Sequence, residues 1–371
     1  MVLLAACILL FITYSLLIIY YWQSWKSIPG FDPSGKTPTT KISVIIPARN
    51  EEENIGTLLQ ALQQQTYSRE FFEVIVVDDN STDATTRVVE NFPGVKILRI
   101  KEDQINSYKK KAIETGIAAA TGSLIVTTDA DCLPPPGWLN TIAAFKEEKN
   151  AILIAAPVIL SSNHTFLHEF QVMDFMALQG ITAAAVHKKF HNMCNGANLA
   201  YERNAFYEVN GFTGIDHIAS GDDMLLMQKI ANRFPGKICY LKSTGAIVST
   251  QPMKTWKEFF NQRRRWASKV NSYKDIKIFL VLILVYLFNF SFLVLLISGW
   301  WDRRYWAWLA GAWVLKTLVE LPFFYSLNRF FNKNLNLINF FFFQPFHIAY
   351  TIIAGLLGQF GKYEWKGRMV K

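Results

Sequence analysis

Cysteine is scarce in this sequence. The four cysteines among 371 residues lie far apart, at Cys7, Cys132, Cys194 and Cys239. Their spacing matches neither a metal-ligand motif nor a disulfide framework. The sequence therefore does not predict a disulfide-stapled secreted domain, and it suits a reducing compartment.

No nucleic-acid-binding module is recognisable either, although the formal net charge is +9. The basic residues lie mainly beside apolar segments or inside particular motifs. An anionic membrane surface or an anionic substrate explains such a distribution better than nucleic acid does. We therefore expect no nucleic-acid partner.

Long apolar runs, in contrast, are abundant at both ends of the chain. Hydrophobic residues make up 51% of the sequence and aromatic residues 15%, and the excess lies in residues 1–22 and roughly 276–360. The first run is about long enough to cross a bilayer. Because it lacks the basic start and the cleavage site of a signal peptide, we expect a retained transmembrane anchor over 1–24.

The C-terminal apolar region, 276–360, predicts about three transmembrane or interfacial helices, at about 278–298, 305–327 and 336–358. The second of these carries Lys316 and Glu320 one helical turn apart, and we expect the two side chains to pair inside the membrane. Four crossings would place the basic tail, 361–371, outside the cell, against the positive-inside tendency. Pro345 in the third helix suggests a re-entrant or interfacial segment that would return the tail to the cytoplasm.

Basic residues also set the expected orientation of the soluble region. Lys26, Lys36 and Lys41 follow the first apolar run. Because Lys and Arg gather on the cytoplasmic side of membrane segments, the soluble region is predicted to lie in the cytoplasm. The sequence thus predicts an integral membrane protein with a cytoplasmic domain.

Residues 41–250 have the pattern of an alternating α/β domain. Short, continuously apolar runs alternate with segments of helical spacing, and we expect strands at 41–47, 71–79, 95–100 and 123–129. Such a pattern predicts a mostly parallel sheet covered by helices on both faces. Ligands of these sheets bind beyond the carboxyl ends of the strands.

Two pairs of aspartates stand at predicted strand ends of that kind. Asp78 and Asp79 end one strand, and Asp129 and Asp131 end another. In an extended stretch Asp129 and Asp131 project to the same side, while Ala130 turns inward. A divalent cation would relieve their repulsion, and oxygen ligands suit Mg²⁺ or Mn²⁺ shared with substrate phosphates. A solvated turn or a helix cap is the alternative interpretation of either pair.

A third acidic pair lies in GDDMLLMQK, residues 221–229. Asp222 and Asp223 are suited to opening a helix, where carboxylates favour the helix dipole. The alternative is that one of them is a general base, whose pKa a neighbouring carboxylate would raise toward working pH.

The segment FFNQRRRW, residues 259–266, precedes the C-terminal apolar region. On a helix, Gln262, Arg265 and Trp266 share one face. Arginine offers a fork for phosphate oxygens, and indole offers a flat face for a sugar ring or a lipid head group. A basic amphipathic helix lying on the bilayer, predicted over 251–275, is the competing interpretation.

The order of these motifs resembles that of the membrane-bound family-2 glycosyltransferases of the GT-A fold. The resemblance runs from about Lys41 to Trp266. Its motifs are SVIIPARNEEENI, VVDDNSTD, KKKAIETGIAAATG, TTDAD, CNGANLAYER, GDD and QRRRW. It implies a Rossmann-like α/β domain and, with the flanking apolar segments, an integral membrane enzyme, which we expect in a bacterial inner membrane.

The resemblance implies roles for individual residues on the donor side. A nucleotide-sugar, in the first instance a UDP-sugar, would be bound by Pro47, Arg49, Glu51, Asp78, Asp79, Lys109 and Asp129. Asp131, supported by Asp129, would hold Mg²⁺ or Mn²⁺ on the diphosphate. Arg49 stands where many relatives carry an aromatic residue, which leaves the partner that stacks on the nucleobase open.

On the acceptor side, the resemblance implies that Asp223, with Asp222 beside it, takes the proton of the acceptor hydroxyl in an inverting displacement. Relatives often have Thr-Glu-Asp where this chain has Gly-Asp-Asp, so the choice between the two aspartates stays open. Gln262, Arg265 and Trp266 would contact the diphosphate and the acceptor.

Three functions follow from this pattern. The leading one is a hexosyltransferase that adds sugar to a lipid or lipid-linked acceptor, similar to ceramide- and diacylglycerol-type glucosyltransferases. The alternative is a processive polysaccharide synthase, for which three C-terminal apolar segments are few. A catalytically silent binding or scaffold protein is the third. The sugar, the acceptor, the choice of metal and the oligomeric state stay open.

Overall fold

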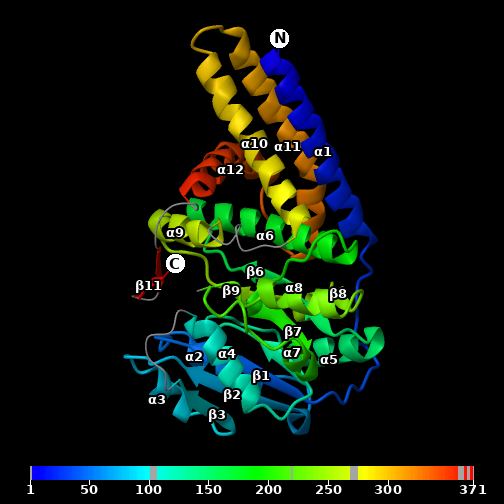
Figure 1. The fold of residues 1–371 in the computed structure, drawn as a ribbon, viewed down its shortest axis with the longest axis vertical. Coiled ribbons are helices and arrows are strands. Elements are labelled where there is room, and N and C mark those ends of the chain that lie inside the picture. Colours follow the sequence, from blue (N-terminus) through cyan, green and yellow to red (C-terminus); the bar gives the residue numbers. More distant parts are fainter. Residues whose placement is uncertain are drawn as a thin grey trace. The chain divides into compact units, whose positions relative to one another are not determined.

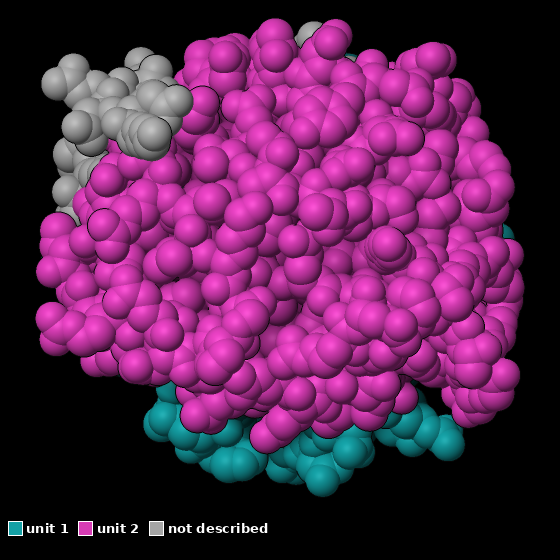
Figure 2. Space-filling model, turned by 90° about the horizontal axis from the view of Figure 1, so that it is seen from below, with its two compact units in different colours: residues 1–27, 162–191, 252–363 teal, residues 28–161, 192–251, 364–371 magenta. Residues whose placement is uncertain are grey.

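The structure is a computed structural model that describes residues 2–100, 107–218, 220–267 and 275–357, and the backbone of 363–365 and 368–370. Residues 268–274 of the predicted interfacial helix and residues 361, 362, 366, 367 and 371 of the predicted basic tail lie outside these residues. The chain divides into two compact units, coloured separately in Figure 2. We call residues 1–27, 162–191 and 252–363 the apolar unit, and residues 28–161, 192–251 and 364–371 the α/β unit.

The α/β unit is built on one seven-stranded sheet, in the order β3-β2-β1-β4-β7-β5-β8. β1 is parallel to β2 and β4, β2 to β3, and β5 to β8, while β7 is antiparallel to β4 and β5. The mostly parallel sheet predicted from the sequence is therefore confirmed. Its strands are β1 (Ile42–Ala48), β2 (Phe72–Asp78), β3 (Val95–Arg99), β4 (Leu124–Thr127), β5 (Leu153–Ala155), β7 (Leu199–Glu202) and β8 (Ile238–Tyr240).

Helices cover this sheet, and a smaller parallel pair, β6 (Val158–Leu160) and β9 (Val248–Thr250), lies beside it (Figure 1). Helix α4 packs closely on β1 and β2, since a Cβ added to its Gly116 would lie 2.6 Å from Ile45. The α-helices are α2 (Ile55–Gln63), α3 (Thr85–Glu90), α4 (Tyr108–Ala118), α5 (Trp138–Lys149), α7 (Arg203–Glu208) and α8 (Met224–Arg233). Short 3₁₀ turns are η1 (Arg69–Phe71), η2 (Gly196–Asn198) and η3 (Thr244–Ala246).

Among its described residues, the apolar unit contains four helices that are long and apolar enough to cross a membrane: α1 (Val2–Ser27), α10 (Ile276–Ser298), α11 (Arg304–Phe330) and α12 (Leu337–Leu357). Two more helices belong to this unit, α6 (Phe166–His187) and α9 (Trp256–Ala267). Figure 1 shows α1, α10 and α11 running side by side. One N-terminal and three C-terminal apolar helices agree with the sequence prediction.

A charged pair is buried among the apolar helices. Lys316 Nζ lies 2.7 Å from Glu320 Oε1, which confirms the predicted pairing one helical turn apart. The Gln344 side chain bonds both partners, at 2.5 Å from Lys316 Nζ and 2.6 Å from Glu320 Oε2, and the Tyr14 hydroxyl donates to Glu320. Lys316 and Glu320 of α11 thus neutralise each other, and Tyr14 of α1 and Gln344 of α12 give them hydrogen bonds where water would be scarce.

Candidate active site

The carboxyl ends of three neighbouring parallel strands define the site. In the sheet register Ala48 at the end of β1 faces Asp78 at the end of β2, and Ile45 of β1 faces Thr127 at the end of β4. The segments that follow these strands therefore leave the sheet at the same edge. They carry the aspartates and Arg49 that the sequence singled out.

Asp78 and Asp79 form a buried corner after β2, each 3% exposed. The Ser81 amide donates to both oxygens of the Asp78 carboxylate, at 3.3 and 3.4 Å, so Asp78 caps this turn. Arg49 Nη1 donates to the carbonyls of Asp79, at 2.7 Å, and Asn80, at 3.2 Å, and lies 4.0 Å from Asp79 Oδ1. The Arg49 side chain thus holds the backbone of this corner.

Pro47 and Glu51 flank this corner. Pro47 is a partly exposed residue of β1. The Glu51 amide donates to Thr85 Oγ1 at 2.7 Å, and its carboxylate accepts from Asn54 Nδ2 at 2.8 Å. A hollow of about 180 Å³ beside them is lined by Asn50, Glu51, Glu52, Glu53, Asn54 and Asp83. This acidic lining would repel an anion such as a diphosphate.

The Asp-Ala-Asp motif departs from one expectation. β4 ends at Thr127, and the Cys132 amide donates to the Asp129 carbonyl at 3.1 Å, so the motif forms a turn rather than an extended stretch. Ala130 is nevertheless buried, while Asp129 and Asp131 are both partly exposed. Burial, followed by the charges of these two aspartates, holds the pKa of the Cys132 thiol well above its usual range.

Lys109 on α4 connects two of the acidic motifs. Its Nζ lies 2.6 Å from Asp129 Oδ1 and 3.4 Å from Asp222 Oδ2. Burial by itself would lower the pKa of Lys109, but the charges of Asp129, Asp222 and Asp223 outweigh it and raise the pKa above its ordinary value. The ammonium therefore stays charged among three carboxylates.

Asp223 is fixed by backbone amides at both oxygens. As the N-cap of α8, it accepts from the Met224 amide through Oδ1 at 2.7 Å, and it accepts from the Gly196 amide through Oδ2 at 3.1 Å. The helix-opening role proposed from the sequence is thus real. A helix-capping role does not exclude general base catalysis, because each carboxylate oxygen has a second lone pair that can accept a proton.

Gly196 lies at the centre of this group, a position that the sequence prediction did not single out. A Cβ at Gly196 would lie 3.2 Å from Asp222 Oδ2, 3.5 Å from Asp223 Cβ and 3.6 Å from Lys109 Nζ. Its carbonyl accepts from Thr127 Oγ1 at 2.9 Å, which ties the segment to the end of β4. The spacing within CNGANLAYER gave no sign of this close approach.

Two residues further on, Asn198 fixes the same segment in the core. Its side chain accepts from Trp138 Nε1 at 2.9 Å and donates to the carbonyls of Pro157 and Ala246, both at 2.8 Å. Asn198 is fully buried. These bonds satisfy three of the four hydrogen bonds that an amide side chain can make.

Gln262, Arg265 and Trp266 lie on α9 in the apolar unit, and their part in a site stays a prediction. All three are partly exposed. Their neighbour Arg263 is buried, with Nη2 2.5 Å from Asp174 Oδ2, and its guanidinium stacks 4.2 Å from the Trp266 ring. No pattern in the sequence indicates this buried pair.

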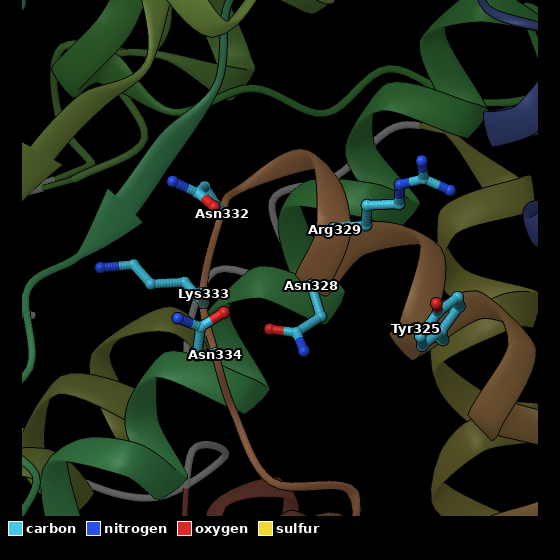
Figure 3. Close-up of a pocket in the computed structure, with 6 residues that line it drawn as sticks. All are labelled: Tyr325, Asn328, Arg329, Asn332, Lys333 and Asn334. Carbon is cyan, nitrogen blue, oxygen red and sulfur yellow. The ribbon is translucent and has the colours of Figure 1, made fainter.

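A second hollow, of about 270 Å³, lies at the end of α11 and is lined by Tyr325, Asn328, Arg329, Asn332, Lys333 and Asn334. Figure 3 shows the side chains of Arg329 and Lys333 pointing to opposite sides. Two cations that point apart do not converge on one anion. We therefore do not assign a phosphate site to this hollow.

Comparison with known proteins finds a similarity that covers most of the α/β unit and residues 162–191 of the apolar unit. Residues 43–209 match the family described as glycosyl transferase family 2. This part of the chain is therefore similar to family-2 glycosyltransferases. That match covers β1 to β4, the Asp-Ala-Asp turn and the Gly196 segment.

Individual relatives agree with this assignment. The probable glycosyltransferase YdaM of Bacillus subtilis is 27% identical over 70% of this chain and 61% of its own length. The undecaprenyl-phosphate 4-deoxy-4-formamido-L-arabinose transferase of Proteus mirabilis is 32% identical over 29% of this chain and 34% of its own length. The chain thus spans less than two thirds of the length of these relatives.

A solved structure shares the fold. The mannosyltransferase of Pyrobaculum calidifontis, solved in complex with GDP-Man and Mn²⁺, superposes with a TM-score of 0.57 at 19% identity, over 95% of this chain and 98% of its own. At that identity the likeness concerns the fold. It agrees with the Rossmann-like GT-A architecture and the flanking helices expected from the sequence.

Proposed function

We propose that this protein transfers a hexose from a nucleotide-sugar, in the first instance a UDP-sugar, to a lipid or lipid-linked acceptor at the cytoplasmic face of a membrane. The observation that carries the proposal is the convergence of Asp129, Asp222 and Asp223 on Lys109. It occurs at the edge of the sheet where ligands of parallel sheets bind. A merely structural edge would not need so many charges in one place.

The donor would lie between two parts of this edge. The buried corner of Asp79 and Arg49 would bind the nucleobase, and Lys109 would attract the diphosphate, away from the acidic hollow beside Glu51. The mannosyltransferase that shares the fold was solved with GDP-Man. A guanine nucleotide is therefore the donor to test beside uridine.

A divalent metal fits the donor atoms of the Asp-Ala-Asp turn. Asp129 and Asp131 offer oxygens only, both are partly exposed, and Mg²⁺ is often held by one or two carboxylates plus substrate phosphates. Within the described ranges no cluster of three or more His, Cys, Asp or Glu forms a closed metal site. When bound, the metal would supply positive charge for the departing nucleotide. The mannosyltransferase that shares the fold was solved with Mn²⁺.

Transfer would be a direct displacement with inversion. Asp223, oriented by the Met224 and Gly196 amides, would accept the proton of the acceptor hydroxyl as its oxygen attacks the anomeric carbon. The bond from that carbon to the diphosphate oxygen breaks, and the nucleoside diphosphate leaves with the electron pair. Lys109 would balance the charge that develops on it. Asp222, paired with Lys109, is the competing base.

The apolar unit is the reason for proposing a lipid or lipid-linked acceptor. Four helices that could span a membrane would keep the domain at the lipid surface, where an acceptor with a lipid tail is concentrated. The relative from Proteus mirabilis is named for transfer involving undecaprenyl phosphate. Gln262, Arg265 and Trp266 on the interfacial helix would contact such an acceptor.

Mass spectrometry of products tests the proposal. Purified full-length protein would receive UDP- and GDP-sugars, Mg²⁺ or Mn²⁺ and a native lipid extract, with Asp223→Asn as control. A lipid heavier by one or two sugar units, absent with the control variant, is the expected product. A ladder of long products would replace the proposal by a processive synthase, and donor binding without any product would indicate a silent binding protein.

A further inference from the structure

Lys110, the residue next to Lys109, is a buried cation that the proposed mechanism does not use. It is 2% exposed, and its Nζ donates to the carbonyls of Ile215, at 2.8 Å, Ile218, at 2.5 Å, and Ser220, at 2.9 Å. A buried ammonium is costly unless its donors are satisfied. Three carbonyls match the three N–H groups of a lysine side chain.

The position of these carbonyls along the chain is informative. Ser220 directly precedes Gly221-Asp222-Asp223, and Gly221 has a φ of +79°, which residues other than glycine rarely adopt. A glycine at this point would otherwise leave the acidic pair free to rotate. Lys110 fixes the backbone before Gly221, and Lys109 fixes the Asp222 side chain after it.

We propose that Lys110 is a positioning residue for the acidic pair: by capping the carbonyls before Gly221, it keeps Asp222 and Asp223 in the geometry that sugar transfer needs. This inference rests on the proposed function, since it assigns Lys110 to the site of that reaction. It concerns the Gly-Asp-Asp segment, residues 221–223, which begins with a glycine. Because glycine has more accessible backbone conformations than other residues, the acidic pair needs a second contact to fix it.

A second lysine provides a matched control. Lys229 on α8 donates to the carbonyls of Gly211, at 2.6 Å, and Thr213, at 2.9 Å, near the start of the same connecting segment. Both lysines therefore cap carbonyls between α7 and α8. They differ in that the Lys110 contacts reach Ser220 and the Lys229 contacts do not.

The experiment compares Lys110→Met with Lys229→Met in the full-length protein. We expect Lys110→Met to lower kcat by about 10- to 100-fold through misplacement of the base, with the Kd for UDP and the KM for the donor close to wild type. Lys229→Met should leave kcat unchanged, even where it lowers the melting temperature. Equal losses of kcat in both variants, or a folded Lys110→Met with wild-type kcat, would overturn the inference.

Two further measurements keep the test decisive. If Lys110→Met does not fold, Lys110→Gln, which retains two N–H donors, should fold and show an intermediate kcat; wild-type kcat there would also overturn the inference. Hydrogen exchange at the amides of Asp222, Asp223 and Met224 should rise in the Lys110 variant and not in Lys229→Met. This exchange readout needs no turnover, so it separates failure of this inference from failure of the proposed function, in which the wild type itself transfers no sugar.

Discussion

The two units of this protein handle buried charge in different ways. In the apolar unit, Lys316 and Glu320 are sealed by Gln344 and Tyr14, so each charge has its partners within the helices. In the α/β unit, Lys109 is shared among several carboxylates, and the Asp129 side chain stays 38% exposed. A closed network can only hold structure together, whereas an open one can exchange partners with a ligand.

This difference suggests how to tell structural from functional charges. Replacing a member of a closed, buried pair should lower stability, because the remaining charge has no partner. Replacing a partly exposed member of the open cluster, such as Asp129 or Asp223, should change turnover and leave stability nearly intact, because water reaches the charges that remain.

The largest effects are expected at the open cluster. Asp223→Asn should lower kcat by about 10²- to 10⁴-fold, the usual contribution of a general base, and leave UDP binding intact. Asp131→Asn should also abolish turnover, but by removing metal-dependent UDP binding. Calorimetric titration of UDP with and without Mn²⁺ distinguishes the two variants.

Asp222→Asn is the matched control for Asp223→Asn. A greater loss of kcat in Asp222→Asn would assign the general base to Asp222. Loss of UDP binding in Asp223→Asn would instead give Asp223 a structural role.

The buried pair of Asp174 and Arg263 should respond in the opposite way. Asp174→Asn leaves the guanidinium buried without its counter-charge, and we expect the free energy of unfolding to fall by about 3–5 kcal/mol. Glu202→Gln, which breaks a 2.6 Å pair with Lys146 at a partly exposed site, should cost only about 0–1 kcal/mol. Thermal or denaturant unfolding in detergent measures both. Equal losses in the two variants would contradict the distinction by burial.

His191 predicts how stability depends on pH. Burial lowers its pKa to about 4, with smaller effects from Asp275 and Lys277, and its Nε2 lies 2.8 Å from the Tyr21 hydroxyl. The pKa of this histidine is 6.5 in the unfolded chain, so between pH 6.5 and pH 4 the unfolded chain binds the proton more readily than the folded protein does. The free energy of unfolding should therefore decrease as the pH is lowered through this window, by up to about 3 kcal/mol. Above pH 6.5 this contribution is fully present.

Unfolding curves from pH 7 to pH 4 check this dependence. His191→Gln keeps an acceptor for Tyr21 and should flatten the slope in that window. His217→Gln, at a side chain that is 70% exposed, should leave the slope unchanged. An unchanged slope in the His191 variant would assign the acid sensitivity to other groups.

The sequence predicted the elements of this fold better than it predicted their contacts. Continuous apolar runs report burial on both faces, so the four predicted strands and the four apolar helices were found near their observed positions. The end of β4 was placed too late, because the turn at Asp129 depends on a backbone hydrogen bond that no side-chain pattern encodes.

Long-range contacts of the site were harder to foresee for a related reason. Lys110 meets Ser220, and Arg263 meets Asp174, across many residues of intervening chain. Periodicity states which face of an element is buried but not what covers it. Lys316 and Glu320 were predicted as a pair because one helix turn brings them together without any help from the fold.

The smallest expected effect compares two glycines, one in each unit. At Gly196 a Cβ would press on the Asp222 carboxylate at 3.2 Å, which must shift by a few tenths of an ångström, and we expect kcat to fall by about 3- to 10-fold with little loss of stability. At Gly180 in the apolar unit, a Cβ would meet Leu327 at 2.6 Å, so Gly180→Ala should lower the melting temperature instead.

Gly137→Ala, whose Cβ would find no side-chain atom nearer than 3.8 Å, controls for the change of residue alone. Activity and melting temperature measured on all three variants should separate into one loss of turnover, one loss of stability and one neutral change. A loss of stability in Gly196→Ala as large as in Gly180→Ala would mean that the site is packed as tightly as the helices are. The open cluster of charges would then be part of the scaffold, and a ligand would have to displace packed atoms to enter it.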